Sequence, residues 1–187
     1  MDEQGRAAVL GWQRIVAAEW DRQQATLAGP PKSANGWPVD PPRTERVIPG
    51  TNERIQGGVA DGPAGDVLTY VAAQVHARVE DLTLAAASGE HDEWGYAPRK
   101  IRGSATAISN HASATAIDLN ASRHPLGARG TFTQEQTAEI HRILAEVDNV
   151  VRWGGDYSSR ADEMHFEINA SQEEVARVAR RLAQGTG

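Results

Sequence analysis

Two short segments of the sequence carry side chains of the kind that bind metal ions. The first, residues 109–120, reads SNHASATAIDLN and contains His111 and Asp118. The second, residues 162–168, reads DEMHFEI and contains His165. Two imidazoles and one carboxylate, with a fourth position left for water, form the ligand set of a catalytic zinc site. These three residues therefore predict a metal centre that activates water.

Both segments alternate between polar and apolar residues, as half-buried β-strands do. One face of the first carries Asp118, and one face of the second carries His165 and Glu167. If the two segments pair in one sheet, the apolar face goes to the core and a carboxylate lies beside an imidazole. His111, seven residues before Asp118, can return from a loop as a third ligand. The apolar face consists of Ile117, Leu119, Met164, Phe166 and Ile168.

A His or Asp in a sheet is more often a hydrogen-bonded structural group than a metal ligand, so the surrounding sequence has to decide. The first segment resembles the S-x-H-x-x-G-x-A-x-D motif of the LAS metallopeptidases, a group named for lysostaphin, D-Ala-D-Ala carboxypeptidases and sonic hedgehog. Ala114 stands where that family usually has Gly, which indicates a positive φ or the close approach of another backbone. The residues that match the motif are Ser109, His111, Ala116 and Asp118.

Two later stretches resemble the second half of the same family. They are residues 153–157 (WGGDY) and residues 162–167 (DEMHFE), and the likeness in order and spacing covers roughly residues 35–185. It is closest to the phage-endolysin and D-Ala-D-Ala carboxypeptidase branch. The resemblance implies that Zn²⁺ is the metal and that peptidoglycan peptides, which contain D-amino acids, are the substrate.

The resemblance also indicates which residues perform the chemistry. Zinc activates water and polarises the carbonyl group, and a nearby carboxylate carries the proton. The family places this Asp or Glu three residues before the last His ligand, which here is Asp162, and Glu163 is the local alternative. A Gly-Tyr pair followed closely by Arg supplies an arginine that grips the substrate. Arg99 is the nearer match and Arg102 the competing one.

Further residues are candidates to contact the substrate or to hold a ligand in place, and they are Ser109, Trp153 and Glu167. For either arginine, and for Glu167, the alternative is a solvated charge without a catalytic role. The other histidines, His76, His124 and His141, are expected to be structural or, for His124, at the surface or rim.

Composition limits the class of protein. The 187 residues are sufficient for one domain, or one domain with an appendage, and have the hydrophobic content of a globular protein. A net charge of −6 without a basic cluster argues against nucleic-acid binding. Because there is no Cys, a metal would need His and carboxylate ligands. The sequence has no apolar run of 18 residues, so we expect no membrane insertion.

The N-terminus has neither the basic n-region nor the apolar h-region of a signal peptide. We therefore expect a phage endolysin, made in the host cytoplasm and brought to the cell wall by a holin or another export route. One alternative is a bacterial D-Ala-D-Ala carboxypeptidase or dipeptidase, which would normally carry an export signal. The other is a catalytically silent, hedgehog-like metal-binding module, against which Asp162 argues because a structural site does not need a base.

Local pattern alone predicts a mixed α and β protein. The resemblance specifies an α+β fold of the hedgehog/DD-peptidase kind, with a small antiparallel sheet that carries the zinc site and helices on the other face. We expect an amphipathic helix over residues 1–30, on which Trp12 and Trp20 share the apolar stripe, and a zinc peptidase domain over residues 31–187.

Within that domain the periodicity predicts a helix over residues 65–80. Two more helices begin with capping boxes, one at Thr133 with Gln136 and one at Ser171 with Glu174. Residues 150–153 predict a strand. Residues 45–55 predict a small hairpin about Pro49–Gly50 or a surface linker.

Overall fold

The computed structural model describes residue 14, residues 17–18, residues 29–83 and residues 92–185. The chain divides into two compact units, Met1–Pro31 and Lys32–Gly187. In the first unit Arg14, Ala17 and Ala18 are helical and exposed. Residues 29–30, the end of the predicted helix over residues 1–30, are not helical, and the remainder of that prediction lies outside the described residues. Within the described ranges, no helix has both the length and the apolar character needed to cross a membrane.

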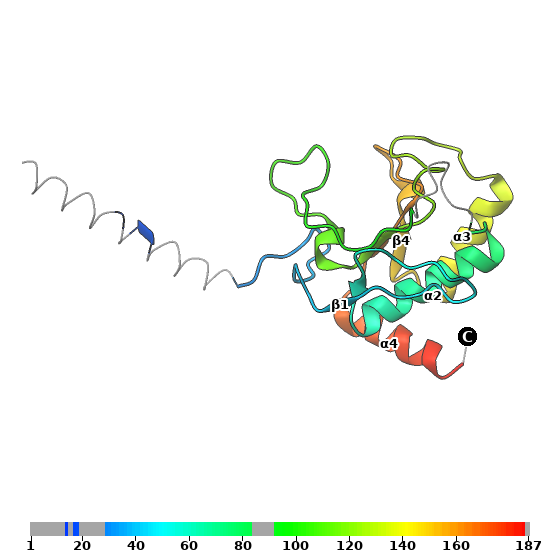
Figure 1. Ribbon diagram of the computed structural model, residues 1–187, viewed down its shortest axis with the longest axis horizontal. Helices are drawn as coiled ribbons and strands as arrows, with labels where there is room; N and C mark the ends of the chain where they lie inside the picture. Colours follow the sequence, from blue (N-terminus) through cyan, green and yellow to red (C-terminus); the bar gives the residue numbers. More distant parts are fainter. Residues whose placement is uncertain (1–13, 15–16, 19–28, 84–91, 186–187) are drawn as a thin grey trace, which may run out of the picture. The chain divides into compact units, whose positions relative to one another are not determined.

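The second unit has the predicted α+β architecture (Figure 1). Its main sheet is antiparallel and has the strand order β3-β5-β4. In the register between β3 and β5, Asp118 lies directly opposite His165. The two segments expected to carry the metal ligands are therefore neighbours in one sheet. The strands are β3 (Ala116–Asp118), β4 (Val151–Trp153) and β5 (His165–Ile168).

Three helices pack together beside this sheet (Figure 1): α2 (Pro63–Arg78), α3 (Gln134–Glu146) and α4 (Gln172–Ala183). Helix α2 contacts α3, α4 and the apolar face of β5, so it forms the centre of the core. The alternation of the strands explains this arrangement, because one face of the sheet is apolar and has to be covered. The core residues include Ile117, Phe166 and Ile168 from the sheet and Val67, Leu68, Val71 and Val75 from α2.

The starts of the helices agree with local sequence signals. Thr133 and Ser171 both form complete capping boxes, as predicted, and each satisfies backbone N–H groups of a first turn. Helix α2 begins with Pro63, whose fixed φ suits a first helical position, and has Asp66 in its first turn.

A second, two-stranded sheet consists of β1 (Arg43–Thr44) and β2 (Val59–Ala60). Between these strands the predicted hairpin is present only as a single antiparallel bridge that joins Val47 to Arg54. The turn is nevertheless anchored to the core, because Ile48 and Ile55 are fully buried.

His124 was expected at the surface or at the rim of the site, and this prediction is wrong. The ring is buried and stacks on Phe132, with 3.9 Å between the ring centroids. Its Nε2 lies 2.8 Å from a carboxylate oxygen of Glu80, and its Nδ1 lies 2.6 Å from Thr131 Oγ1. His76 and His141 have the expected structural roles. His76 accepts a hydrogen bond from the backbone of residue 82, and His141 pairs with Asp156 at the surface.

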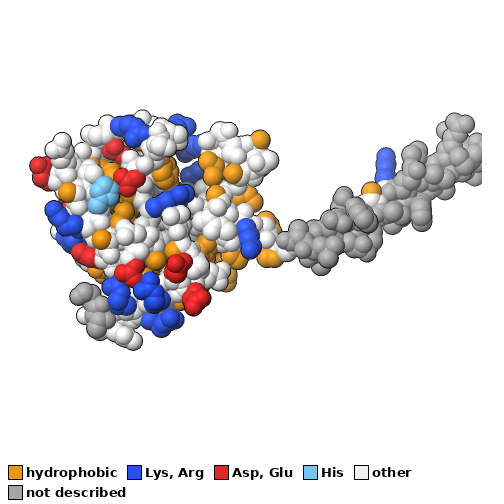
Figure 2. All heavy atoms as spheres, turned by 180° about the vertical axis from the view of Figure 1, so that it is seen from behind, with side chains coloured by type: hydrophobic (Ala, Val, Ile, Leu, Met, Phe, Trp, Pro, Cys, Tyr) orange, Lys and Arg blue, Asp and Glu red, His pale blue; other side chains and the backbone are white. Residues whose placement is uncertain are grey.

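Charged side chains of both signs share the molecular surface. On the face drawn in Figure 2, Lys and Arg side chains lie among Asp and Glu side chains and apolar side chains. This face has no broad basic surface of the kind that binds a nucleic-acid backbone.

A short 3₁₀ helix, η1 (Asn110–Ser113), precedes β3 and ends at Ala114. Ala114 has φ 52° and ψ 29°, which is the left-handed conformation that the family's Gly at this position suggested. The methyl group of Ala114 is fully buried in the core. Replacement by Gly therefore has two opposing effects: it relieves backbone strain and it removes a packed methyl group.

We expect Ala114→Gly to change the free energy of unfolding by less than about 1 kcal/mol, because the strain and the methyl burial are of similar size. Ala116→Gly is the matched control, because Ala116 is also fully buried but has ordinary strand geometry. We expect the control to be less stable than Ala114→Gly by about 1 kcal/mol. Urea unfolding of both variants measures the difference. Equal losses at the two positions would show that Ala114 is unstrained.

Glu93 is a buried acid that does not belong to the predicted site. It is 1% exposed, and its Oε1 has no hydrogen-bond partner. Burial, together with the neighbouring Asp92 carboxylate, raises the pKa of Glu93 from 4.5 to about 7. Between these two pH values the folded chain keeps a proton that the unfolded chain has lost. The free energy of unfolding therefore falls as the pH rises through this window.

We expect Glu93→Gln to remove this pH dependence, because the amide cannot ionise. Relative to the native protein, the variant should gain about 1–3 kcal/mol of stability between about pH 5 and pH 8. Chemical denaturation at both pH values tests this. A constant difference between variant and native protein across the range would contradict it.

Candidate metal centre

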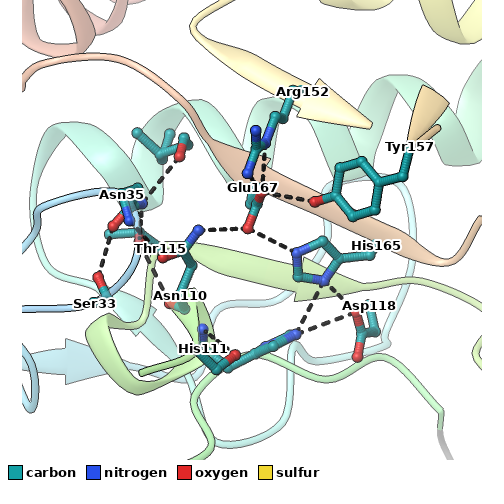
Figure 3. Close-up of polar contacts among 12 residues, drawn as sticks. Ser33, Asn35, Asn110, His111, Thr115, Asp118, Arg152, Tyr157, His165 and Glu167 are labelled. Carbon is teal, nitrogen blue, oxygen red and sulfur yellow. Dashed lines mark hydrogen bonds and ion pairs between the residues drawn. The ribbon is translucent and has the colours of Figure 1, made fainter. Parts of the chain in front are cut away.

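Three potential ligand atoms face one another on the polar side of the main sheet (Figure 3). They are Nε2 of His111 from η1, Oδ1 of Asp118 from β3 and Nδ1 of His165 from β5. The distances are 3.1 Å between the two nitrogens, 3.3 Å from His111 to Asp118 and 2.8 Å from His165 to Asp118. Ligand atoms about 2.0–2.2 Å from a tetrahedral ion are separated by about 3.3–3.5 Å. Small adjustments would therefore suit one ion, and no other such group occurs among the described residues.

The outer nitrogen of each imidazole is held by a hydrogen-bond acceptor. His111 Nδ1 donates to the carbonyl oxygen of Gly95 at 2.6 Å. His165 Nε2 donates to a carboxylate oxygen of Glu167 at 3.0 Å (Figure 3). A neutral ring that donates through its outer nitrogen presents a lone pair on its inner nitrogen. Both lone pairs then face the carboxylate of Asp118, which is the arrangement of metal-binding histidines.

The electrostatics of the centre favour a cation. Burial alone lowers the pKa of His165, but hydrogen bonds and charges from Asp118 and Glu167 outweigh it and raise that pKa to about 10. Burial alone raises the pKa of Asp118, but the interactions with His111 and His165 hold it well below its ordinary value. The surroundings thus stabilise positive charge where the three donors meet. Nitrogen and carboxylate donors in a site of this charge fit a divalent metal ion.

Glu167 connects the centre to its surroundings (Figure 3). The residue is only 4% exposed, which excludes the alternative of a solvated edge charge. Besides His165, its carboxylate accepts hydrogen bonds from Asn110 Nδ2 at 2.5 Å, Arg152 Nε at 2.5 Å and the Tyr157 hydroxyl at 2.6 Å. Burial raises the pKa of Glu167, but these partners outweigh it and keep the pKa well below its ordinary value. The buried carboxylate is therefore ionised and fully hydrogen-bonded, and it fixes the orientation of the His165 ring.

The partners of Glu167 were not predicted from the sequence. Arg152 lies opposite Glu167 in the β4–β5 register, and strand alternation could have found it, because Val151 and Trp153 both face the core. Burial raises the pKa of Tyr157, and the Glu167 charge raises it further, so the phenol stays protonated and donates. Asn110 is the neighbour of His111 in η1. No local pattern indicated that its side chain reaches Glu167.

Two glycines allow the backbone to approach closely at this centre. A Cβ on Gly95 would lie 2.2 Å from the carbonyl oxygen of Gly58, so only Gly can place its own carbonyl group against His111. A Cβ on Gly154, the first residue of η2 (Gly154–Asp156), would lie 2.3 Å from the carbonyl oxygen of Asp162. Gly154 therefore leaves space for the turn that precedes β5.

Asp162 and Glu163 lie in this turn and have different surroundings. Asp162 lines the cleft beside the metal centre, and its Oδ1 is buried without a hydrogen-bond partner. Burial raises the pKa of Asp162. The carboxylate of Glu163 instead accepts hydrogen bonds from the backbone N–H groups of Gly130 and Thr131, at 2.7 and 2.8 Å. Of these two carboxylates, Asp162 lines the cleft and Glu163 is bound to that loop.

A cleft of about 340 Å³ opens over the metal centre. Arg99 and Arg102 both line it; Arg99 is half-buried, whereas Arg102 is exposed. Among the charges that act on Asp162 is that of Arg99, which lowers its pKa. Ser109 also lines the cleft and caps η1, because its hydroxyl accepts a hydrogen bond from the backbone of His111. Strand alternation placed Met164 on the apolar face, but its side chain lines the cleft and is not part of the core cluster. The reason is that β5 begins only at His165, so the alternation does not extend to Met164.

Trp153 is not among the residues that line the cleft, so of its two expected roles the structure does not support contact with substrate. Its side chain is buried in the core, where it packs on Phe166 and Phe132. The indole N–H donates to the carbonyl oxygen of Glu163 at 2.7 Å. Trp153 therefore supports the turn before β5 from the core side of the sheet.

The chain matches a known protein family over part of its length. Residues 102–168 match the family model described as D-alanyl-D-alanine carboxypeptidase. The matched stretch contains all three potential metal ligands and Asp162, whereas Arg99 lies outside it. Neither a curated protein nor a solved structure matches the chain significantly.

We expect the native protein to bind one zinc ion per chain and to lose it in His111→Ala, Asp118→Ala or His165→Ala. Elemental analysis after dialysis measures this, and full occupancy in any of the three variants would remove that residue from the ligand set.

We further expect Glu167→Gln to weaken zinc binding about 10- to 100-fold, because the amide orients His165 less well than the carboxylate does. Competition with a chelator measures the affinity. Glu173→Gln, on the exposed first turn of α4, is the control with the same chemical change. Equal zinc affinity in both variants would mean that Glu167 only stabilises the fold.

Proposed function

Because residues 102–168 belong to the D-alanyl-D-alanine carboxypeptidase family of LAS-type metallopeptidases, we propose that the protein is a zinc-dependent peptidoglycan peptidase. It would hydrolyse an amide bond in the stem peptide or cross-bridge of the cell wall. The observation that carries the proposal is the position of Asp162. Oδ1 of its carboxylate is buried without a hydrogen-bond partner. The residue lines the same cleft as His111 and His165.

His111, Asp118 and His165 would hold the metal ion. When bound, the ion supplies Lewis acidity, which makes water a better nucleophile and polarises a carbonyl group. Asp162 would accept the proton of the attacking water and pass it to the leaving amine. Its raised pKa suits this exchange, because a stronger base accepts the proton more readily.

Arg99 would stabilise the negative charge that develops on the carbonyl oxygen. It is half-buried, it lines the cleft, and its charge acts on Asp162. A cation aimed at developing charge in a partly enclosed site contributes more than it would in water. Arg102, which is exposed, would contact substrate farther from the reacting atoms.

Within this class we propose the role of a phage endolysin catalytic domain, made in the host cytoplasm and brought to the wall by a holin or another export route. A bacterial D-Ala-D-Ala carboxypeptidase or dipeptidase is the second candidate, which the description of the matched family favours. A silent metal-binding module would not use Asp162, so the placement of this residue favours an enzyme.

Zymography on purified cell walls tests the proposal. We expect clearing by the zinc-loaded protein, loss of clearing on chelation and recovery when zinc is restored. Mass spectrometry of the released peptides then separates the two roles, because a carboxypeptidase liberates free D-Ala and an endopeptidase liberates longer peptides. Zinc-loaded protein that neither clears walls nor releases any product would contradict the proposal.

We expect Asp162→Asn to lower turnover by about 10²–10⁴-fold, because the amide keeps the shape and removes the basicity. Zinc content and melting temperature should stay native. Glu163→Gln is the matched control and should retain activity within about threefold, because its carboxylate faces the loop at Thr131. The assignment would be reversed if Glu163→Gln were inactive and Asp162→Asn remained active.

A further inference from the structure

An exposed tryptophan lies on the same face of the sheet as the metal centre. Trp94 and Asp118 are directly opposite each other in an antiparallel bridge. Each donates its backbone N–H to the carbonyl oxygen of the other, at 2.9 and 2.8 Å. Residues paired in this way direct their side chains to one face of a sheet, with their Cα atoms about 5.5 Å apart. Because Asp118 faces the metal centre, the indole of Trp94 lies beside that centre.

The residues on either side of Trp94 agree with this orientation. Glu93 is buried, and a Cβ on Gly95 would lie 3.0 Å from the side chain of Ile55, which is fully buried in the core. Both neighbours therefore face the core. Strand alternation then puts Trp94 on the opposite side of the sheet, where the potential metal ligands are.

The indole of Trp94 is available for contact with another molecule. Trp94 is 46% exposed, whereas Trp37 is half-buried and Trp153 is buried. The indole N–H groups of Trp37 and Trp153 donate to backbone carbonyl oxygens. A single exposed apolar side chain is ordinary at a protein surface. Trp94 differs from that case because it adjoins the centre at which substrate has to bind.

Polar side chains lie next to this indole on the same face. Gln56 is paired with Trp94 in a parallel bridge and is half-buried. Arg54, two residues earlier on that strand and therefore on the same face, is exposed. A flat aromatic ring beside amide and guanidinium groups suits a sugar ring better than an apolar partner. The C–H groups of the sugar pack on the indole, and its hydroxyl groups accept hydrogen bonds from the polar neighbours.

The size of the cleft explains why a polymeric substrate would reach Trp94. The cleft has a volume of about 340 Å³, which is at the lower end of the range for ligand sites, so it holds only a short piece of peptide. Trp94 is not among the residues that line it. The rest of a peptidoglycan chain has to lie on the surface around the cleft, and Trp94 is one strand away from Asp118 on that surface.

We propose that Trp94 is a platform on which a sugar ring of the cell-wall polysaccharide packs, while a peptide attached to that sugar occupies the cleft. This inference rests on the proposed peptidase function and adds a contact with the carbohydrate part of the substrate. The protein then prefers a peptide that is still attached to its sugar over the same peptide alone.

Two substrates with the same D-Ala-containing stem peptide test the inference. In one, the amino end of the peptide is attached to N-acetylmuramic acid, and in the other it is acetylated. We expect kcat/KM of the zinc-loaded native protein to be about tenfold higher for the substrate with the sugar, as one well-packed Trp contact provides. Equal kcat/KM for the two substrates would overturn the inference while the peptidase function stands.

Variants of Trp94 show whether this residue causes the preference. Trp94→Ala should raise KM for the substrate with the sugar about tenfold and leave its kcat unchanged, because a sugar far from the reacting atoms is bound equally in ground and transition states. Its constants for the acetylated peptide should stay native. Trp94→Phe, which keeps an aromatic ring, should restore most of the preference. An equal loss of kcat on both substrates in Trp94→Ala would contradict the inference, because Trp94 would then act only through Asp118.

Val47→Ala is the matched control. Val47 is 41% exposed and lies opposite Arg54, so it is on the same face as Trp94 but two strands away. The variant removes an exposed apolar side chain about 10 Å from the indole, which is too far for contact with the same sugar ring. It should keep the native preference for the substrate with the sugar.

Calorimetric titration with a short oligosaccharide of N-acetylglucosamine gives a readout that does not depend on turnover. The native protein should bind it about tenfold more tightly than Trp94→Ala does. If neither peptide substrate is hydrolysed, the proposed function fails, but this difference in binding would still support the platform. Equal binding of the oligosaccharide by both proteins would overturn the inference as well.

Discussion

The register between β3 and β5 is the constraint on which the metal centre depends. Asp118 and His165 lie on one face of the sheet because they are direct partners in this register. A slip of one residue would move every side chain of a strand to the opposite face. It would carry His165 and Glu167 into the core and bring Phe166 out. Burial of Phe166, Ile117 and Ile168 therefore stabilises the same register that the polar face requires.

The polar face is stable because its buried groups have partners. Glu167 joins His165 to Asn110, Arg152 and Tyr157, and Asn110 is in turn bound by the backbone of Asn35 at 2.9 Å. Oδ1 of Asp162 is the exception in this region. An unpaired buried oxygen lowers the stability of the fold, and a catalytic role would explain why it is kept. The network thus fixes the potential ligands and leaves one oxygen of Asp162 unbound, which is the carboxylate that we propose as the proton carrier.

Much of this arrangement could be predicted from the sequence, since it depends on local patterns. Strand alternation gave the faces of β3 and β5, the capping boxes gave the starts of α3 and α4, and the family motif indicated the left-handed Ala114. The role of Asn110 could not be predicted, because Glu167 lies 57 residues farther along the chain. Tyr157 is 10 residues from Glu167, but the irregular turn between them has no periodicity from which the contact could be read. The burial of His124 was missed because one of its two partners, Glu80, lies 44 residues earlier in the chain.

The acceptor for His111 lies outside the stretch that matches the family model, and this affects where a functional domain can begin. The family match covers residues 102–168, but the carbonyl group that orients His111 belongs to Gly95, which packs on Gly58. Ser33, still earlier in the chain, donates to Ser113 at the end of η1. A fragment cut to the matched residues would keep all three ligands and lose the groups that aim one of them. A fragment that keeps all of these contacts therefore starts no later than Ser33, well before residue 102, where the family match begins.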